Sequence, residues 1–301
     1  MSQHLLIAIV GPTAVGKTAL SIELARYFKT EIISADSRQF YREMEIGTAK
    51  PTVDELAAVP HHFINNLSVH NDYNAGQYEK EVLACLDSLF KTHEKVIMVG
   101  GSGLFINAVC HGFDALPEGN DVLREEYELI LKEKGIKPLQ EELKKVDPEY
   151  YKEVDVNNHR RLIRALEVYH QTGLPFSHFR KRQGVQRNFN TIKIGLNIDK
   201  EILRQRINKR IDDMLEAGWQ EECLKLYPDR NLNALKTVGY TELFDFIEGK
   251  VDWNTTVQNI KTNTWQYAKR QLTWFKKDTG VKWFSPDEFN EIVDYINSAT
   301  F

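Results

Sequence analysis

The sequence lacks several features that would place it in a specialised class of protein. It has three cysteines in 301 residues, Cys85, Cys110 and Cys223, which are far apart and without C-x-x-C spacing. This pattern argues against a disulfide framework or a structural zinc site and fits a reducing compartment. The N-terminus has no basic segment, and the apolar run Leu5–Val10 is too short for a signal peptide core or a membrane span. We therefore expect a cytoplasmic protein with no membrane contact.

Neither sign of charge dominates the composition. Lys and Arg number 39 and Asp and Glu 43, the net charge is −4, and 42% of residues are hydrophobic. These values exclude a disordered, collagenous or coiled-coil chain, and the total gives no sign of a nucleic-acid partner. The total hides two basic segments: residues 160–187 hold seven Lys or Arg against one Glu, and residues 259–282 hold six against one Asp. The placement of charge therefore permits an RNA partner.

Short apolar runs alternate with amphipathic helical patterns through most of the chain. The runs Leu5–Val10, Ile32–Ser34, Val96–Val99 and Ile192–Leu196 predict buried parallel strands, and Val281–Phe284 an edge strand. Residues 119–187 show only helical patterns, at Glu125–Lys134, Leu139–Val146 and Arg160–His170. We expect an α/β core formed by residues 1–118 and 188–301, with helices on both faces of a parallel sheet, and a mainly helical insertion domain at 119–187.

A complete phosphate-loop motif, G-x-x-x-x-G-K-[ST], follows the first strand. Its residues are Gly11, Pro12, Thr13, Ala14, Val15, Gly16, Lys17 and Thr18. A buried strand precedes it and an amphipathic helix follows, which is the context that such a loop requires. The backbone N–H groups and Lys17 can bind a di- or triphosphate, and the Thr18 hydroxyl can bind Mg²⁺. The core is therefore expected to be P-loop NTPase-like, although the motif does not identify the phosphate ester.

Asp36 lies directly after the second predicted strand, at the sheet edge where open α/β proteins bind ligands. A carboxylate there can hold Mg²⁺ or accept a proton from a nucleophile, and it can equally serve as an ordinary turn residue. The third strand ends in Gly100 and Gly101 without a carboxylate. This favours a transferase over a motor or switch ATPase.

Six further segments extend the pattern beyond the loop. Residues 31–51 read EIISADSRQFYREMEIGTAKP, 99–105 VGGSGLF, 160–168 RRLIRALEV, 206–218 R-x-x-x-R-I-x-x-M-L-x-x-G, 237–242 TVGYTE and 269–275 KRQLTWF. In this order, from Gly11 to about Lys276, they closely resemble the tRNA dimethylallyltransferase family.

The resemblance implies transfer of a dimethylallyl group from dimethylallyl pyrophosphate to the exocyclic amino nitrogen of the adenine on the 3′ side of the tRNA anticodon. It implies that the loop binds the pyrophosphate with Mg²⁺. By similarity, Asp36 accepts the proton, Thr13 contacts the leaving oxygen, and Lys17 and Arg210 neutralise the leaving charge. The base must leave its stack to reach a buried donor.

Further residues match family positions that contact the anticodon stem-loop of tRNA. They are Asp36, Ser37, Arg38, Gln39, Ser102, Arg124, Arg160, Arg161, Leu162, Ile163, Arg164, Lys236, Gly239, Tyr240, Glu242, Lys269, Arg270, Gln271 and Lys276. Phe40 or Tyr41 is a candidate aromatic surface for the base, with core packing as the alternative. We expect a monomer. Two other functions stay open on the residues alone: a kinase that uses ATP, and a non-catalytic RNA-binding protein.

Overall fold

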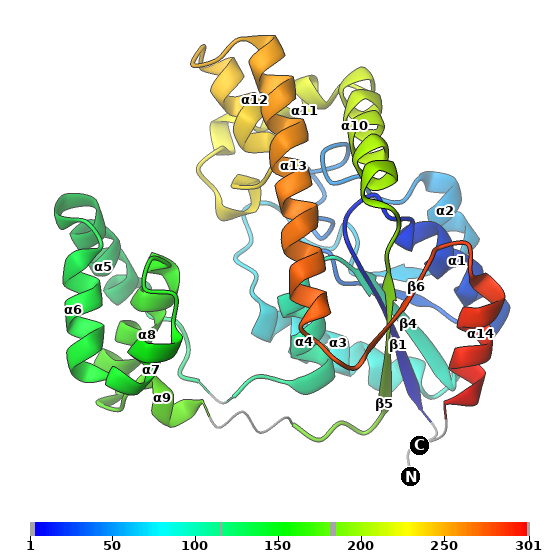
Figure 1. The fold of residues 1–301 in the computed structure, drawn as a ribbon, viewed down its shortest axis with the longest axis horizontal. Coiled ribbons are helices and arrows are strands. Elements are labelled where there is room, and N and C mark those ends of the chain that lie inside the picture. The colour runs from blue at the N-terminus through cyan, green and yellow to red at the C-terminus, as the bar shows by residue number, and fades with distance from the viewer. Residues whose placement is uncertain (1–3, 115, 181–184, 300–301) are drawn as a thin grey trace. The chain divides into compact units, whose positions relative to one another are not determined.

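One six-stranded sheet organises the chain in the computed structural model, which describes residues 4–114, 116–180 and 185–299 (Figure 1). All neighbouring strands are parallel, in the order β3-β2-β4-β1-β5-β6. The strands are β1 (Leu5–Val10), β2 (Ile32–Ser34), β3 (His61–His62), β4 (Lys95–Gly100), β5 (Asn190–Leu196) and β6 (Val281–Phe284). The five predicted strands are confirmed, with β6 at an edge. The sequence missed β3, because two residues are too short to show a period.

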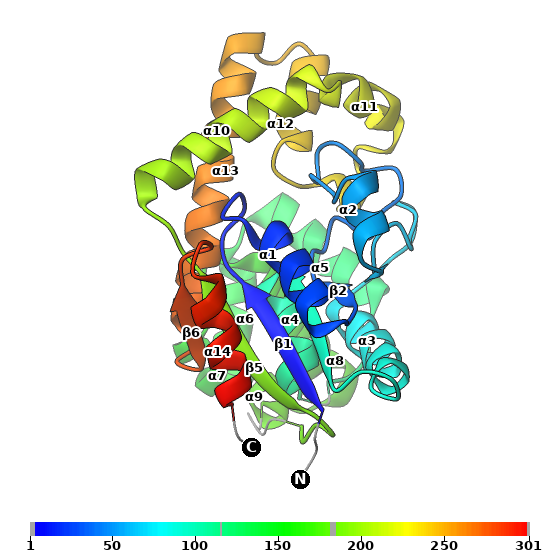
Figure 2. The same ribbon diagram turned by 90° about the vertical axis from the view of Figure 1, so that its right-hand side faces the viewer.

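The central strand β1 carries a hydrophobic core on each face of the sheet. Leu5, Ile7 and Ile9 pack with the helices on one face, and the residues between them pack with those on the other. The first face is covered by α1 (Lys17–Phe28) and α14 (Phe289–Ser298), which lie on the near side in Figure 2. The other face is covered by α3 (Ala75–Leu89) and α4 (Gly103–His111). The predicted fold class, a parallel sheet with helices on both faces, is confirmed.

Further helices surround the carboxyl ends of the strands. They are α2 (Val53–Ala58), α10 (Lys200–Glu216), α11 (Trp219–Leu226), α12 (Tyr240–Ile247) and α13 (Trp253–Lys276), with 3-10 turns at Tyr227–Asp229 and Asn233–Leu235. Buried residues of α10 to α13 belong to the same core as α1 and α14. This packing places α10 and α13 beside the phosphate loop. No described helix is long and apolar enough to cross a membrane.

The chain divides into two compact units, residues 1–110 with 187–301, and residues 111–186. The second unit contains α5 (Asp121–Lys134), α6 (Lys137–Val146), α7 (Pro148–Glu153), α8 (His159–Thr172) and α9 (Phe176–Phe179). It has its own core, to which Tyr127, Leu139 and Leu143 contribute. Two residues of the predicted basic segment, Lys181 and Arg182, lie outside the described part of the chain.

Two of the residues predicted to contact RNA in this unit have buried side chains. Leu162 and Ile163 are 0% and 3% exposed, inside the core of the helical unit. The motif RRLIRALEV places its arginines and its apolar residues on different faces of α8, because a helix turns about 100° per residue. The two apolar side chains therefore stabilise the unit, and contact between this motif and RNA stays a prediction.

Candidate active site

The phosphate loop joins β1 to α1 in a tightly wound conformation. Gly11, Ala14 and Gly16 have positive φ angles of 146°, 64° and 113°. Gly16 is the N-cap of α1, and no described side chain caps this helix end. The first N–H groups of a helix have no intrahelical partner, and with the helix dipole they favour an anion. The loop geometry thus suits the predicted binding of a phosphate group.

Lys17 lies over the loop. Its Nζ donates hydrogen bonds to the carbonyl oxygens of Gly11, at 3.1 Å, and Pro12, at 2.7 Å. Burial lowers the pKa of Lys17 to about 8, with Asp36 opposing this shift and Arg210 adding to it. A phosphate bound in the loop would stabilise the charged form of this buried ammonium group.

A polar cleft extends from the loop toward α10 and α13. Thr13, Lys17, Thr18 and Asp36 line it together with Arg206 and Arg210 of α10. Arg206 Nη1 donates to the Val15 carbonyl at 3.2 Å, and Arg210 Nη2 donates to the Ala49 carbonyl at 3.2 Å. The structure therefore brings all four predicted catalytic residues, Thr13, Lys17, Asp36 and Arg210, to one cleft. Arg206 was missed as a site residue, although its spacing of four from Arg210 places both on one helix face.

Asp36 follows β2 and lies at the junction of this cleft with a second cavity. Its Oδ1 accepts a hydrogen bond from the Arg38 N–H at 3.0 Å, so the carboxylate also forms a turn. The Ser102 hydroxyl accepts the Ser37 N–H at 3.1 Å and holds the segment after β4 to the segment after β2. Asp36 can therefore form the turn and line the cleft at the same time, in one conformation.

Gln271 of α13 fastens the phosphate loop to the end of β4. Its Oε1 accepts the Thr13 N–H at 2.9 Å, and its Nε2 donates to the Gly101 carbonyl at 3.0 Å. The residue is 6% exposed. A Cβ on Gly101 would lie 2.1 Å from Gln271 Nε2, so only glycine allows this approach. Both ends of the side-chain amide are engaged inside the protein, and the predicted contact of Gln271 with tRNA stays a prediction.

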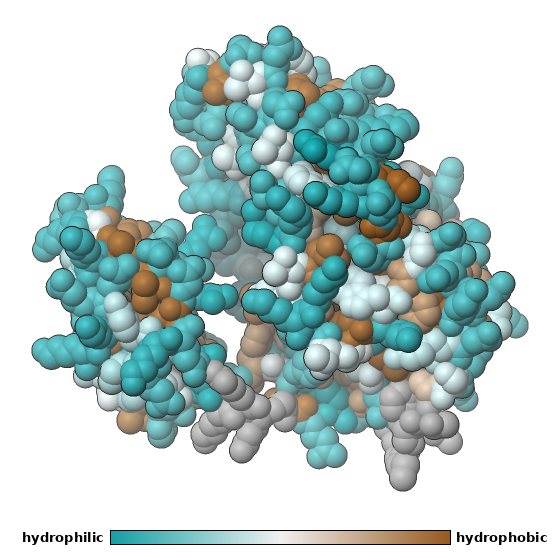
Figure 3. All heavy atoms as spheres, in the orientation of Figure 1, coloured by the Kyte–Doolittle hydropathy of each residue, from teal (hydrophilic) through white to brown (hydrophobic). Residues whose placement is uncertain are grey.

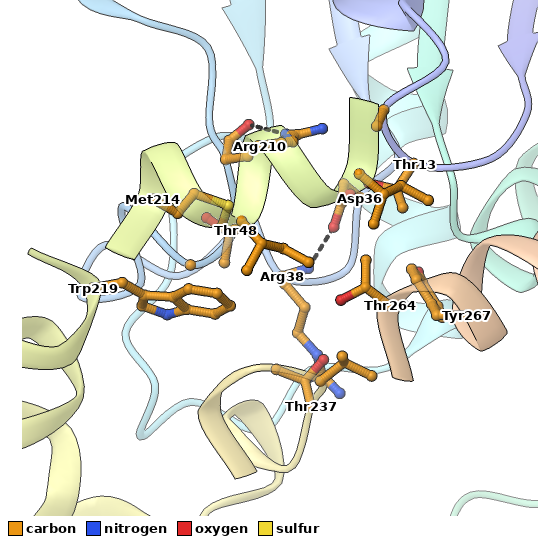
Figure 4. A pocket seen from close by; sticks show the side chains of 16 residues that line it. Thr13, Asp36, Arg38, Thr48, Arg210, Met214, Trp219, Thr237, Thr264 and Tyr267 are labelled. Carbon is orange, nitrogen blue, oxygen red and sulfur yellow. Dashed lines mark hydrogen bonds between the residues drawn. The ribbon is translucent and has the colours of Figure 1, made fainter. Parts of the chain in front are cut away.

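The second cavity opens from the cleft and has a mixed lining (Figure 4). Thr13, Asp36 and Tyr267 lie at one end in Figure 4, and Met214 and Trp219 lie at the other. The complete lining is Thr13, Ala14, Asp36, Arg38, Gly47, Thr48, Ala49, Ile207, Arg210, Ile211, Met214, Trp219, Thr237, Val238, Thr264 and Tyr267. The cleft thus continues into a space with an apolar wall. The sequence did not predict this wall, because its members come from segments far apart in the chain.

The basic residues of α13 that were predicted to bind RNA are exposed. Lys269, Arg270 and Lys276 lie on its outward side, and the surface over α13 is largely hydrophilic in Figure 3. Lys269 Nζ lies 5.8 Å from the centre of the Trp265 ring. Lys236 is likewise exposed, while Arg38 and Gln39 are partly buried beside Asp36. Lys236, Lys269, Arg270 and Lys276 therefore present positive charge to solvent on the first unit.

The segment TVGYTE is largely structural. The Tyr240 hydroxyl donates to Glu222 Oε1 at 2.6 Å, and the Glu242 carboxylate accepts the Gly239 N–H and the Asn263 side-chain amide, both at 2.6 Å. All three predicted residues, Gly239, Tyr240 and Glu242, are buried. Gly239 and Tyr240 pack against Trp219 behind the cavity lining, and the RNA contacts expected of these three residues stay predictions.

The aromatic candidates for the base also lie inside the protein. Phe40 and Tyr41 are 0% and 4% exposed. Phe40 packs on Tyr78 with ring centres 5.3 Å apart. Core packing, the alternative interpretation, is therefore the correct one for both.

In the helical unit, the predicted arginines differ in their surroundings. Arg160 and Arg161 are exposed on α8. Arg124 and Arg164 pair with the buried carboxylate of Glu167, at 3.3 and 3.2 Å, and Arg164 also donates to the Pro117 carbonyl. The last two therefore neutralise an internal charge and retain only part of their capacity for an external anion.

The described residues contain no group of three or more His, Cys, Asp and Glu side chains arranged to hold a metal ion. The oxygen donor predicted for Mg²⁺, the Thr18 hydroxyl, lines the cleft beside Lys17.

The sheet order, the loop between β1 and α1, and the cleft at the carboxyl ends of the strands define a P-loop α/β protein. A model of the IPP transferase family matches residues 39–278, and the chain belongs to this family. The resemblance predicted from the motifs is therefore confirmed.

Individual relatives match over nearly the whole chain. The tRNA dimethylallyltransferase of Christiangramia forsetii is 53% identical over 299 residues, covering 99% of each chain. The crystal structure of the full-length tRNA isopentenylpyrophosphate transferase from Bacillus halodurans has a TM-score of 0.72 and 36% identity, covering 98% of this chain and 96% of that one. A eukaryotic dimethylallyltransferase acting on tRNA has a TM-score of 0.81 and 25% identity, covering 99% of this chain and 81% of that one.

Proposed function

We propose that this protein transfers a dimethylallyl group from dimethylallyl pyrophosphate to the exocyclic amino nitrogen of the adenine on the 3′ side of the tRNA anticodon. The C1–O bond of the donor breaks, pyrophosphate leaves with the electron pair, and C1 bonds to nitrogen, which loses one proton. One observation carries the proposal: the anion-binding cleft continues into a cavity with an apolar wall, and Asp36 lies at the junction. The activity named for the relatives supports the same reaction.

The leaving group is stabilised by positive charge and N–H donors. Lys17, Arg210 and the phosphate loop border the cleft that we assign to the pyrophosphate, so they would neutralise the negative charge that develops on the departing oxygens. The Thr13 hydroxyl, inside the loop, donates to the bridging oxygen. Arg206 adds a second guanidinium at the edge of the loop, where its hydrogen bond to the Val15 carbonyl holds it. Together these groups stabilise pyrophosphate more as its charge increases in the transition state.

Asp36 makes the acceptor nitrogen more reactive. The lone pair of an adenine amino group is delocalised into the ring, so the nitrogen is a weak nucleophile. A carboxylate that accepts one of its hydrogens increases its electron density and removes the proton as the new bond forms. The turn hydrogen bond from Arg38 fixes the orientation of this carboxylate.

The residues of the cleft fit a Mg²⁺ ion that arrives with its substrate. The Thr18 hydroxyl would be the protein oxygen that holds the ion at the phosphate loop. When bound, the ion would neutralise charge on the leaving pyrophosphate.

The acceptor tRNA docks through exposed positive charge, and the target base flips out of its stack to reach Asp36. Lys236, Lys269, Arg270 and Lys276 supply charge in the first unit, and Arg160 and Arg161 supply it in the second. The second unit acts as an inserted RNA-binding domain. We place the protein in the cytoplasm, as a monomer.

A labelling experiment tests this function. Purified protein is incubated with Mg²⁺, unmodified tRNA and labelled dimethylallyl pyrophosphate, and in parallel with labelled ATP. Label from the prenyl donor should enter tRNA at an adenine beside the anticodon. Phosphorylation of an acceptor from ATP, with no prenyl label in tRNA, would instead identify a kinase.

A further inference from the structure

We propose that Trp219 limits the length of the prenyl group that the site accepts, which makes it a specificity-determining residue. This inference rests on the proposed function, because it concerns the tail of the donor whose pyrophosphate occupies the cleft. The indole closes the apolar end of the cavity, opposite Thr13 and Asp36 (Figure 4).

One helix face leads from the anion site to this end. Arg210 of α10 borders the cleft, and Ile207, Ile211 and Met214 of the same helix line the cavity. Residues three, four and seven apart share one side of a helix. The charged side chain of Arg210 therefore lies next to an apolar strip on the same helix. A donor whose pyrophosphate contacts Arg210 therefore directs its hydrocarbon tail along this strip, toward Met214 and Trp219.

The indole is held rigidly between two glycines. Trp219 is 2% exposed. A Cβ on Gly47 would lie 2.1 Å from its Nε1, and a Cβ on Gly239 would lie 2.0 Å from its Cη2. The Tyr240 ring meets it edge-on, with centres 5.8 Å apart. Close backbone on both sides leaves the indole no room to rotate away from a longer ligand.

A partly buried carboxylate fixes the surrounding elements. Glu222, one turn after Trp219 on α11, accepts the backbone N–H groups of Glu45 at 3.0 Å, Ile46 at 2.7 Å and Gly47 at 3.2 Å. It also accepts the Tyr240 hydroxyl. Since one side chain ties the loop, α11 and α12 together, the wall behind Trp219 is a single braced unit. A prenyl tail longer than dimethylallyl must displace this wall or remain partly outside the cavity.

The donor preference of Trp219 variants tests the assignment. We would measure kcat/KM for dimethylallyl and geranyl pyrophosphate with saturating unmodified tRNA and identify the modified nucleoside by mass. The wild-type protein should strongly prefer the shorter donor. Trp219→Ala should shift the ratio toward geranyl pyrophosphate by about tenfold or more, as expected when a pocket gains room for extra methylenes. The same bond-forming step operates with either donor, so only the length of the tail is compared.

Two further variants keep the test decisive. Leu226→Ala truncates another buried side chain of α11 that does not line the cavity, and it should leave the donor ratio unchanged. If Trp219→Ala does not fold, Met214→Ala enlarges the same end and should shift the ratio in the same direction.

The outcomes separate the two claims. Wild-type protein that prenylates tRNA, with variants that retain its donor ratio, would overturn the role of Trp219 alone. Variants that only raise the KM for tRNA would overturn it too, by assigning the wall to the acceptor base. Wild-type protein that transfers neither prenyl group would refute the proposed function itself.

Discussion

The tether formed by Gln271 gives a sharp prediction, because the sequence and the structure assign it different roles. Gln271→Ala removes the acceptor of the Thr13 N–H and the donor to the Gly101 carbonyl. A buried polar group left without a partner costs about 1–3 kcal/mol. If one such cost falls on the positioning of the phosphate loop, kcat/KM for the prenyl donor falls by about five- to 150-fold.

Steady-state kinetics with the donor varied, together with direct tRNA binding, is the appropriate assay. Donor kcat/KM should fall for Gln271→Ala while tRNA affinity stays near that of the wild type. Gln271→Glu retains an acceptor for Thr13 but loses the donor to Gly101 and adds a negative charge beside the cleft, so its donor KM should rise further. Gln266→Ala, at an exposed position on the same helix, is the control. Unchanged donor kinetics with weakened tRNA binding would refute the tether and restore the RNA contact.

Three other predictions address the RNA surface, the helical unit and the thiols. Removing Lys269 or Arg270 should weaken tRNA binding and reduce the slope of log K against log salt by about one per residue; an unchanged slope would exclude the residue. Leu162→Ala should destabilise the helical unit by about 2–5 kcal/mol in urea unfolding, whereas Arg161→Ala should alter tRNA affinity and leave the unfolding midpoint in place; equal effects would contradict the burial. Burial raises the pKa of all three cysteine thiols, so native protein at pH 8 should react with iodoacetamide far more slowly than unfolded protein; rapid native labelling would contradict the packing.

Much of the fold could be read from the sequence because its signals are local. The apolar run at Leu5–Val10 and the glycines of the phosphate loop depend on neighbouring residues, so strand, loop and helix are fixed together. The position of Asp36 follows from the parallel sheet, since the carboxyl ends of parallel strands share one edge.

The cavity wall could not be predicted in this way. Trp219 and Gly47 belong to segments far apart in the chain, and their contact arises only when α11 packs on the loop after β2. Motif matching also could not separate surface from core: within one motif, Arg161 is exposed and Leu162 is buried. A motif can be shared because it builds the site as well as because it touches the substrate, and only packing distinguishes the two cases.

The most direct test of the central claim is single-turnover transfer by Asp36→Ala, with the modified nucleoside identified by mass. Wild-type protein should add one dimethylallyl group to the adenine beside the anticodon. The variant should bind tRNA and pyrophosphate normally but transfer the group about 10²–10⁴ times more slowly, the usual contribution of a general base. Transfer at the wild-type rate, or an equal loss of binding and transfer, would contradict the account.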